Sequence, residues 1–418
     1  MKIKVNKYCI LLFLLIFFEL DCFFLINRYA VYIAGISYYD LLCIAKLLII
    51  FCTICKYKDV FRLKKTFLNI LPIGAMLLTC TSAIAANVVA GQGIIEGIIA
   101  QRDWVSWLLM YYPLSIWLRK GKLDGKKIVR TLCIAAVIYL TLCTAQYLVA
   151  GKVIFLHTDA NERYGSVRLR FNSLLPLVLS GFMIDNIVLD LNKKSKKYSI
   201  VILIATFIFF AVVTKGRMRT LAFCAGVVIC LVLRRASITK KIISILFIIL
   251  LVAFLASTQI GKDTLDILFG SGAGTSADTL SIRTVERLYY LKYLTQSPFN
   301  FIFGCGYPNS AYYTAVRMST PTIGTWTYYT TDVGILGSMY YYGILGCSWF
   351  IVVYLYMLKK GIIIYKHTGK TGFVQGIIID LIGCATLVPL IFNSSILMPL
   401  LVAWAEAEER AIMQKHND

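Results

Sequence analysis

The stretch SIRTVERLYYLKYLTQSPFNFIFGCGYPN at residues 281–309, continued by TTDVGILGSMYYYGILG at residues 330–346, interrupts a chain of apolar runs and short basic connectors. It lies between apolar runs at 241–257 and 333–358, and it enters the second of them. The interval either links two helices or forms a site. The composition of the surrounding chain is the first guide to which of these two alternatives holds.

Composition places the chain among membrane proteins. Of its 418 residues, 59% are hydrophobic and 15% are charged, whereas soluble domains average about 25% charged and about 45–50% apolar residues. The net charge of +22 could also suggest nucleic acid as a partner. However, the Lys and Arg residues cluster between apolar runs, which is how topology is encoded in membranes. We therefore expect a lipid bilayer and no nucleic acid as a partner.

Cysteine and histidine usage gives no sign of a metal site or a disulfide framework. The 13 Cys lie almost all inside apolar runs, where Cys behaves as a small hydrophobic residue. The 3 His are widely scattered. The apolar run after MKIKVNK lacks a small-residue cleavage site, so it predicts a retained first helix rather than a signal peptide. We expect no metal and no cofactor.

The apolar runs predict an all-α, polytopic transmembrane bundle of about 11–12 spans, since a spanning helix needs about 20 apolar residues. The last two runs leave two alternatives open, because Pro389, Asn393 and Pro399 interrupt them. They form either one kinked helix or two short ones. The runs are 8–27, 31–55, 66–90, 104–118, 128–150, 173–191, 199–214, 219–234, 241–257, 333–358, 373–392 and 394–408.

Alternate connectors are rich in Lys and Arg, which predicts that the N-terminus is cytoplasmic. The C-terminus is then cytoplasmic with twelve spans and external with eleven. The whole chain, 1–418, forms a single membrane domain. Residues 258–332 form a large extracytoplasmic loop within it, and loops of this length are usually functional or disordered. Inside that loop, TVERLYYLKYL predicts a short amphipathic helix.

Arginines on the external side depart from this charge pattern. Arg217 and Arg219, in the short turn TKGRMRT, lie at an external helix boundary. They could reach lipid headgroups by snorkelling, or they could form an anion site, because Arg binds phosphate oxygens with two parallel hydrogen bonds. Convergence of these arginines on one cavity would suit a diphosphate-linked lipid. Five more share this side of the membrane: Arg163, Arg168, Arg170, Arg283 and Arg287.

The large loop contains three charged residues at helical spacing. Arg283, Glu286 and Arg287 are one turn apart, and a solvated charge pair is the simplest interpretation. Gly304 and Gly306, in GCG, could cradle a phosphate or form a tight turn. Glu19 and Asp21 in the first run are interpreted as packing or interface residues.

Asp332 lies where the loop re-enters the membrane. It could cap the following helix. Alternatively, its carboxylate could accept a proton from a sugar hydroxyl at an external site.

Three motifs together resemble the bacterial O-antigen polymerase and O-antigen ligase family (Wzy/WaaL-like) of integral membrane proteins. The first is the external turn and helix start KGRMRTLAF, in which either Arg217 or Arg219 matches the family arginine. The second is Arg283, then Pro298, then the G-x-G turn of Gly304 and Gly306. The third is Asp332 before GILG at 343–346. Ligase-type members have His-Asn where this chain has Asp332 and Val333, so the resemblance favours the polymerase branch.

The resemblance implies a metal-independent glycosyltransferase of capsule, exopolysaccharide or O-antigen biosynthesis. The donor would be a glycan on undecaprenyl diphosphate, and the acceptor another undecaprenyl-diphosphate-linked repeat unit on the outer face of the membrane. A chain-length regulator and a flippase are candidate partners. The competing functions are an O-antigen-type ligase, which uses another acceptor, and a flippase or transporter of lipid-linked oligosaccharides.

The resemblance also implies roles for individual residues. A diphosphate leaving group needs its charge stabilised as the bond breaks, and fixed arginines can do this. Asp332 would orient or deprotonate the acceptor, and Arg283 would act in catalysis and in binding. The expected diphosphate-binding residues are Arg217, Arg219, Arg283, Arg287, Arg168 and Arg170.

Overall fold

The computed structural model describes residues 6–27, 30–33, 35–57, 69–150, 152–163, 166–189, 193–233, 276–323, 326–384 and 388–417. The apolar run predicted at 241–257 and the first part of the predicted loop, 258–275, lie outside these residues. The side chains of Arg163 and Arg217 also lie outside the described part, although the backbone of each is described.

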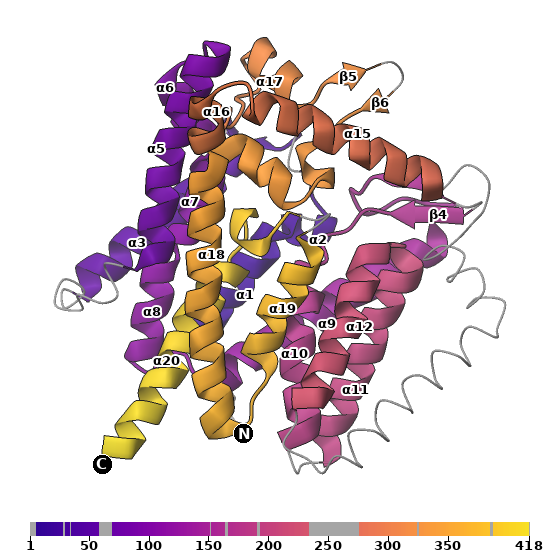
Figure 1. Cartoon of the computed structure of the whole chain (residues 1–418). Coiled ribbons are helices and arrows are strands. Elements are labelled where there is room, and N and C mark those ends of the chain that lie inside the picture. The colour runs from indigo at the N-terminus through magenta and orange to yellow at the C-terminus, as the bar shows by residue number, and fades with distance from the viewer. Residues whose placement is uncertain are drawn as a thin grey trace.

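The described chain is a bundle of helices, and both termini lie at the same end of it (Figure 1). From the N-terminus to the middle of the chain, the helices are α1 (Lys7–Glu19), α2 (Asp21–Phe24), α3 (Tyr38–Lys56), α5 (Ile70–Ala90), α6 (Ile94–Ala100), α7 (Arg102–Leu109), α8 (Tyr111–Arg119), α9 (Gly125–Val149), α10 (Leu174–Leu189), α11 (Lys193–Ile208) and α12 (Arg217–Leu233). The second half contributes α15 (Ser276–Leu294), α16 (Pro298–Phe303), α17 (Tyr313–Ser319), α18 (Ile335–Thr368), α19 (Gly372–Gly383) and α20 (Leu397–Asn417).

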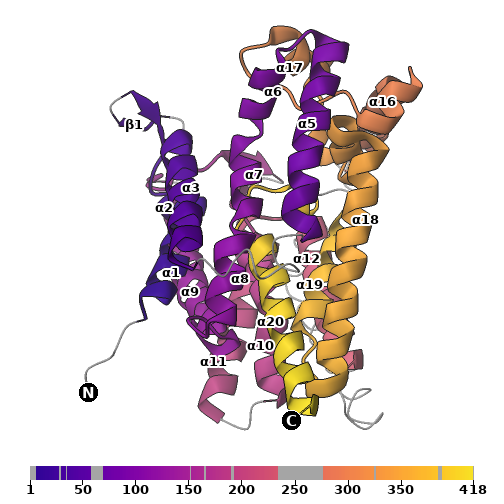
Figure 2. The same ribbon diagram turned by 90° about the vertical axis from the view of Figure 1, so that its left-hand side faces the viewer.

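Three short antiparallel hairpins were not predicted by the all-α interpretation. In each hairpin the two strands are close in sequence, and none joins a larger sheet. They lie at the end of the bundle away from the termini (Figures 1 and 2). The strands are β1 (Tyr32–Ile33) with β2 (Ile36–Ser37), β3 (Ala160–Arg163) with β4 (Ser166–Leu169), and β5 (Thr322–Ile323) with β6 (Trp326–Thr327).

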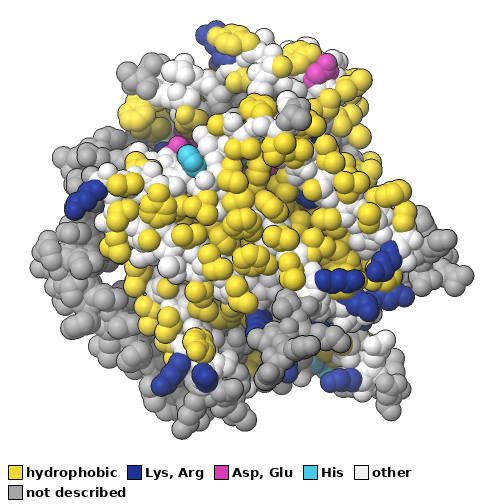
Figure 3. Space-filling model, turned by 180° about the vertical axis from the view of Figure 1, so that it is seen from behind, with side chains coloured by type: hydrophobic (Ala, Val, Ile, Leu, Met, Phe, Trp, Pro, Cys, Tyr) yellow, Lys and Arg dark blue, Asp and Glu magenta, His cyan; other side chains and the backbone are white. Residues whose placement is uncertain are grey.

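Five described helical segments are long and apolar enough to cross a membrane, by length and composition. Shorter apolar helices cover residues 174–187, 219–233 and 372–383. In Figure 3, hydrophobic side chains cover the middle of one face, while Lys and Arg lie mostly in its lower half. This distribution is the one expected of a bundle whose middle faces lipid. The five long segments are Tyr38–Lys56, Ile70–Ala90, Gly125–Val149, Lys194–Val213 and Ile335–Thr368.

The final pair of apolar runs forms two short helices rather than one kinked helix. α19 starts at the end that holds the termini and stops inside the bundle, and α20 returns to the same end (Figure 1). The 12 residues of α19 span about 18 Å at 1.5 Å per residue, less than the roughly 30 Å of a hydrocarbon core. The pair therefore forms a hairpin that starts and ends at the same end of the bundle, which explains why the C-terminus lies at the end that holds the N-terminus.

Polar side chains satisfy the backbone of the break between α19 and α20. Asp380 accepts a hydrogen bond from the backbone N–H of Leu390 at 2.8 Å, and Asn393 donates to the Val388 carbonyl at 3.0 Å. Glu19 accepts from the backbone N–H of Ile396 at 2.9 Å. Unpaired backbone groups are costly inside a membrane, so such partners are required. Glu19 thus supports the break, a role beyond the general packing expected of it.

Candidate functional site

One group of charged residues surrounds the short turn between α11 and α12. The last turn of α11 is followed by a π-helical segment, Phe209–Val213, whose Phe209 carbonyl accepts from the Thr214 N–H at 2.9 Å. Lys215 then adopts a left-handed backbone, with φ +46°, and its side chain is buried. A left-handed residue other than glycine is a local strain that concentrates at functional sites. Lys215 is not among the residues predicted from the sequence to form a site.

Two of the predicted arginines meet at this turn. Arg168, on β4, donates from Nε to the Thr214 carbonyl at 3.0 Å, and Arg219 donates from Nη1 to the Phe171 carbonyl at 3.3 Å. These contacts fasten the β3–β4 hairpin to the start of α12 and direct Arg219 into the protein rather than toward lipid. Arg170 is exposed next to them. The structure therefore brings Arg168 and Arg219 together, as an anion site requires.

The break between α1 and α2 adds a carboxylate to this group. Residues 21–24 all have positive φ, and the Asp21 side chain is buried. The buried ring of Tyr139, which donates to the Asn172 carbonyl, lies within electrostatic range of both Asp21 and Arg219. Asp21 had been interpreted as a packing residue. Asp21 and Arg219 thus share Tyr139 as a neighbour, and we call this group the basic turn (Arg168, Lys215 and Arg219, with Asp21).

A second group lies on α15 and the segment before α18. Glu286 is only 3% exposed, and its Oε2 has no hydrogen-bond partner among the described residues. Burial and the nearby Asp332 raise the pKa of Glu286 to about 7, against the lowering effects of a backbone hydrogen bond from Tyr329 and of Arg283 and Arg287. The solvated charge pair expected at this helix is therefore wrong, because α15 turns Glu286 inward. We call the two carboxylates, Glu286 and Asp332, the acid pair. Arg283 and Arg287 lie near it on α15.

Asp332 does not cap the helix that follows it. It ends a 3-10 turn, Thr330–Asp332, and α18 starts only at Ile335, with Gly334 at the N-cap and no side-chain cap. The Asp332 side chain is exposed, unlike that of Glu286. An exposed carboxylate beside a buried one can meet a substrate from outside while the buried group holds a proton.

The GCG turn is built for close backbone packing. Gly304 and Gly306 have φ of +82° and +84°, and a Cβ on Gly304 would lie 2.6 Å from the Tyr341 backbone. The N–H of Cys305 donates to the Tyr340 carbonyl at 2.7 Å, and the N–H of Gly304 donates to Asn300 at 2.8 Å. The N–H groups of Gly304 and Cys305 thus have partners within the protein, and the close contact at Gly304 makes this a tight packing turn.

A third group of charges lies inside the bundle. Lys46 on α3 is fully buried, and its Nζ is 2.6 Å from Asp103 Oδ1 on α7 and 4.1 Å from the centre of the Trp107 ring. Glu19 lies within electrostatic range of Lys46 and Asp103. This group adjoins the break between α19 and α20, because Glu19 contacts Ile396. Buried charges of this kind in membrane proteins are functional candidates by default.

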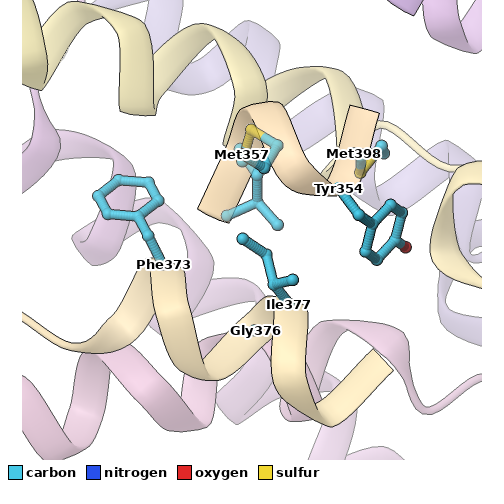
Figure 4. Close-up of a pocket in the computed structure, with 7 residues that line it drawn as sticks. Tyr354, Met357, Phe373, Gly376, Ile377 and Met398 are labelled. Carbon is cyan, nitrogen blue, oxygen red and sulfur yellow. The ribbon is translucent and has the colours of Figure 1, made fainter. Parts of the chain in front are cut away.

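The cavity in Figure 4 has a different character. It lies among α18, α19 and α20, and its lining is apolar apart from the Tyr354 hydroxyl. The labelled side chains include Met357, Phe373 and Ile377, and none of the lining residues is charged. Such a cavity fits helix packing and offers nothing to hold a diphosphate.

No family model, no curated protein and no solved structure matches this chain. Within the described residues, no group of three or more His, Cys, Asp or Glu residues is placed to hold a metal ion. The acid pair lies at α15, at the end of the bundle opposite the termini, and the basic turn lies where α11 and α12 end on the side away from the termini (Figure 1). Their own chemistry is therefore the basis for a functional proposal.

Proposed function

We propose that this protein is a polysaccharide polymerase. It joins undecaprenyl-diphosphate-linked repeat units on the outer face of a bacterial cytoplasmic membrane, for a capsule, an exopolysaccharide or an O-antigen. The observation that carries the proposal is the basic turn, in which Arg168 and Arg219 are fixed by backbone carbonyls beside the buried Lys215. The acid pair at the same end supplies carboxylates for proton transfer.

The basic turn binds the diphosphate of the donor. Its three cations lie within one turn and the adjoining strand, which concentrates positive charge where an anion would bind. Because carbonyl contacts already orient Arg168 and Arg219, little reorganisation is needed when charge develops on the leaving group. The C–O bond between the anomeric carbon and the diphosphate breaks, and undecaprenyl diphosphate leaves with the electron pair.

The acid pair acts on the acceptor. The acceptor hydroxyl forms a new C–O bond to the anomeric carbon and gives its proton to the exposed carboxylate of Asp332. Glu286 has a pKa of about 7, so near neutral pH it exists in both protonation states and can take that proton onward. Arg283 and Arg287 on the same helix limit the repulsion between the two carboxylates.

Substitutions in both groups test this proposal in cells that need this protein to make polymer. We expect Arg219→Ala to lower polymer synthesis about 100-fold, as for loss of one preorganised charge-stabilising donor. We expect Arg219→Lys to recover part of it and Asp332→Asn to lower it strongly. Lipid-linked single repeat units should accumulate on the outer face.

Arg317→Ala is the matched control, because Arg317 is an exposed arginine on α17 at the same end. It should leave the polymer unchanged at equal protein levels. Normal chain-length distributions in Arg219→Ala and Asp332→Asn, with normal protein levels, would show that neither group takes part. Transfer of the glycan to an acceptor that carries no undecaprenyl diphosphate would indicate the ligase instead.

The buried charges favour one other candidate, a flippase of lipid-linked oligosaccharides. Transporters place charged residues and broken helices near mid-membrane, and Lys46 with Asp103 beside the α19–α20 break has this character. The location of the repeat units separates the two functions. Loss of a flippase leaves them on the inner face, whereas loss of a polymerase leaves single units on the outer face.

A further inference from the structure

We propose that a groove between α1 and α3 binds an anionic diacyl phospholipid, with an acyl chain in the groove and the phosphate at two lysines. Its lining residues come mainly from α1 and α3, which lie next to each other at the left edge of Figure 2, and from Trp117 of α8. It is separate from the basic turn and the acid pair and goes beyond the polymerase proposal.

Apolar side chains line the length of the groove. Ile10 and Leu14 contribute from α1, and Ile49 contributes from α3. Trp117 on α8 is almost fully buried beneath them, with its ring centre 5.4 Å from that of Tyr8. Ile10 and Leu14 are 45% and 37% exposed, so the walls offer apolar surface that a hydrocarbon chain can cover.

The mouth of the groove is basic. The hydroxyls of Tyr8 and Tyr57 are hydrogen-bonded at 2.9 Å, which closes this end between α1 and α3. Lys7 lies 5.7 Å from the Tyr8 ring, and Lys56 lies 5.6 Å from the Tyr57 ring. Both lysines are exposed. Two cations at the end of an apolar channel match the phosphate and acyl chain of one lipid molecule.

Charge complementarity selects the class of lipid. A zwitterionic lipid brings its own cation to the two lysines, whereas phosphatidylglycerol brings only the phosphate. Each Lys near an anionic lipid surface contributes electrostatic binding free energy. The loss of two lysines should therefore weaken lipid binding roughly 30-fold. The groove walls contribute to both lipid classes equally, so the lysines set the preference.

Native mass spectrometry of the purified full chain, with equimolar phosphatidylglycerol, phosphatidylcholine and undecaprenyl phosphate, tests the proposal. We expect the protein to retain one phosphatidylglycerol in preference to the other two lipids. Lys7→Gln/Lys56→Gln should weaken retention about 30-fold. Leu14→Trp, which fills the groove from an exposed position, should also displace the lipid while both lysines stay in place.

Lys126→Gln/Lys415→Gln is the control, because it removes two exposed lysines outside the groove. It should keep the bound lipid. Equal loss in both double variants would mean general surface attraction, and full retention in Leu14→Trp would mean that the groove is not used. Stronger retention of undecaprenyl phosphate or phosphatidylcholine would overturn the assignment of the occupant.

Discussion

For several charged residues in this protein, burial gives a different role from the one that sequence spacing predicts. Glu286 has the spacing of a surface ion pair, yet its carboxylate is buried beside Asp332. Lys215 belongs to a motif that drew attention for its arginines, yet it is the cation that the fold buries. Removing a charge from water is costly unless it is paired, so such positions are maintained by a specific surrounding structure. Those surroundings are where the proposed chemistry takes place.

Glu286 should give the stability of the protein a pH dependence. The pKa of Glu286 is raised to about 7 in the folded protein from an ordinary value of 4.5. Between these values the folded state holds a proton that the unfolded state has released, so stability falls as pH rises through this window. The apparent Tm of purified protein should therefore drop from pH 5 to pH 7 more steeply in the wild type than in Glu286→Gln.

Glu96→Gln is the control for this experiment, because it removes a carboxylate from α6 outside the acid pair. It should keep the slope of the wild type. Identical slopes in the wild type and Glu286→Gln would show that Glu286 does not hold a proton in the folded protein.

At the scale of secondary-structure elements, the main feature is that several helices are broken or bent. α1 breaks before α2, α19 ends inside the bundle, and α18 bends at Gly343, where φ is +61°. The bend places Gly343 against the Ile302 carbonyl, next to Gly304 of the GCG turn. The two glycine motifs thus meet in one backbone contact, which packs α16 on α18. This contact helps position the segment that carries Asp332 beneath α15.

Gly343→Ala should destabilise this contact. A Cβ at this position would overlap the Ile302 carbonyl, and alanine would also have to adopt a left-handed backbone. We expect a loss of roughly 1–3 kcal/mol, measured as a lower apparent Tm. Gly376→Ala is the matched control, because no atom lies within 4 Å of the added Cβ in α19. A Tm for Gly343→Ala as high as that of the control would contradict the packing role of the bend.

At the scale of the whole molecule, the distribution of Lys residues and the order of the helices both distinguish the two ends of the bundle. The termini and the connectors α10–α11 and α18–α19 lie at one end, with Lys193, Lys194 and Lys370 in or next to those connectors. α15, α16, α17 and the three hairpins lie at the other end. Positive residues favour the cytoplasmic side, so the end with the termini is the expected cytoplasmic face.

Reporter fusions test this orientation. A fluorescent protein that folds only in the cytoplasm should be active after residue 418. Alkaline phosphatase, which needs an oxidising compartment, should be active when inserted at the exposed residues 310–311 between α16 and α17. Exchange of the two reporters should abolish both signals. Phosphatase activity at the C-terminus would show that α19 and α20 do not return to the same side.

The sequence by itself determined the helical, membrane-type composition and the positions of most described helices, and it singled out the arginines of the basic turn as departures from the charge pattern. These features depend on local hydropathy and charge. Both can be read from a segment of about 20 residues without knowing which other segments pack against it. The uncertain pair at the C-terminus could not be resolved in this way. Its break depends on Asp380 and Glu19, and Glu19 lies far away in the chain.

Only the tertiary structure decided which charges are buried and which of them meet. The basic turn joins residues from α2, β4 and α12, and the acid pair joins α15 to the segment before α18. Asp21 gave a weak signal in sequence as a carboxylate inside an apolar run, and Lys215 as the first of three cations in TKGRMRT. The interval that begins at Ser281 proved to contain a buried carboxylate, because burial is set by what packs on α15 rather than by its own spacing.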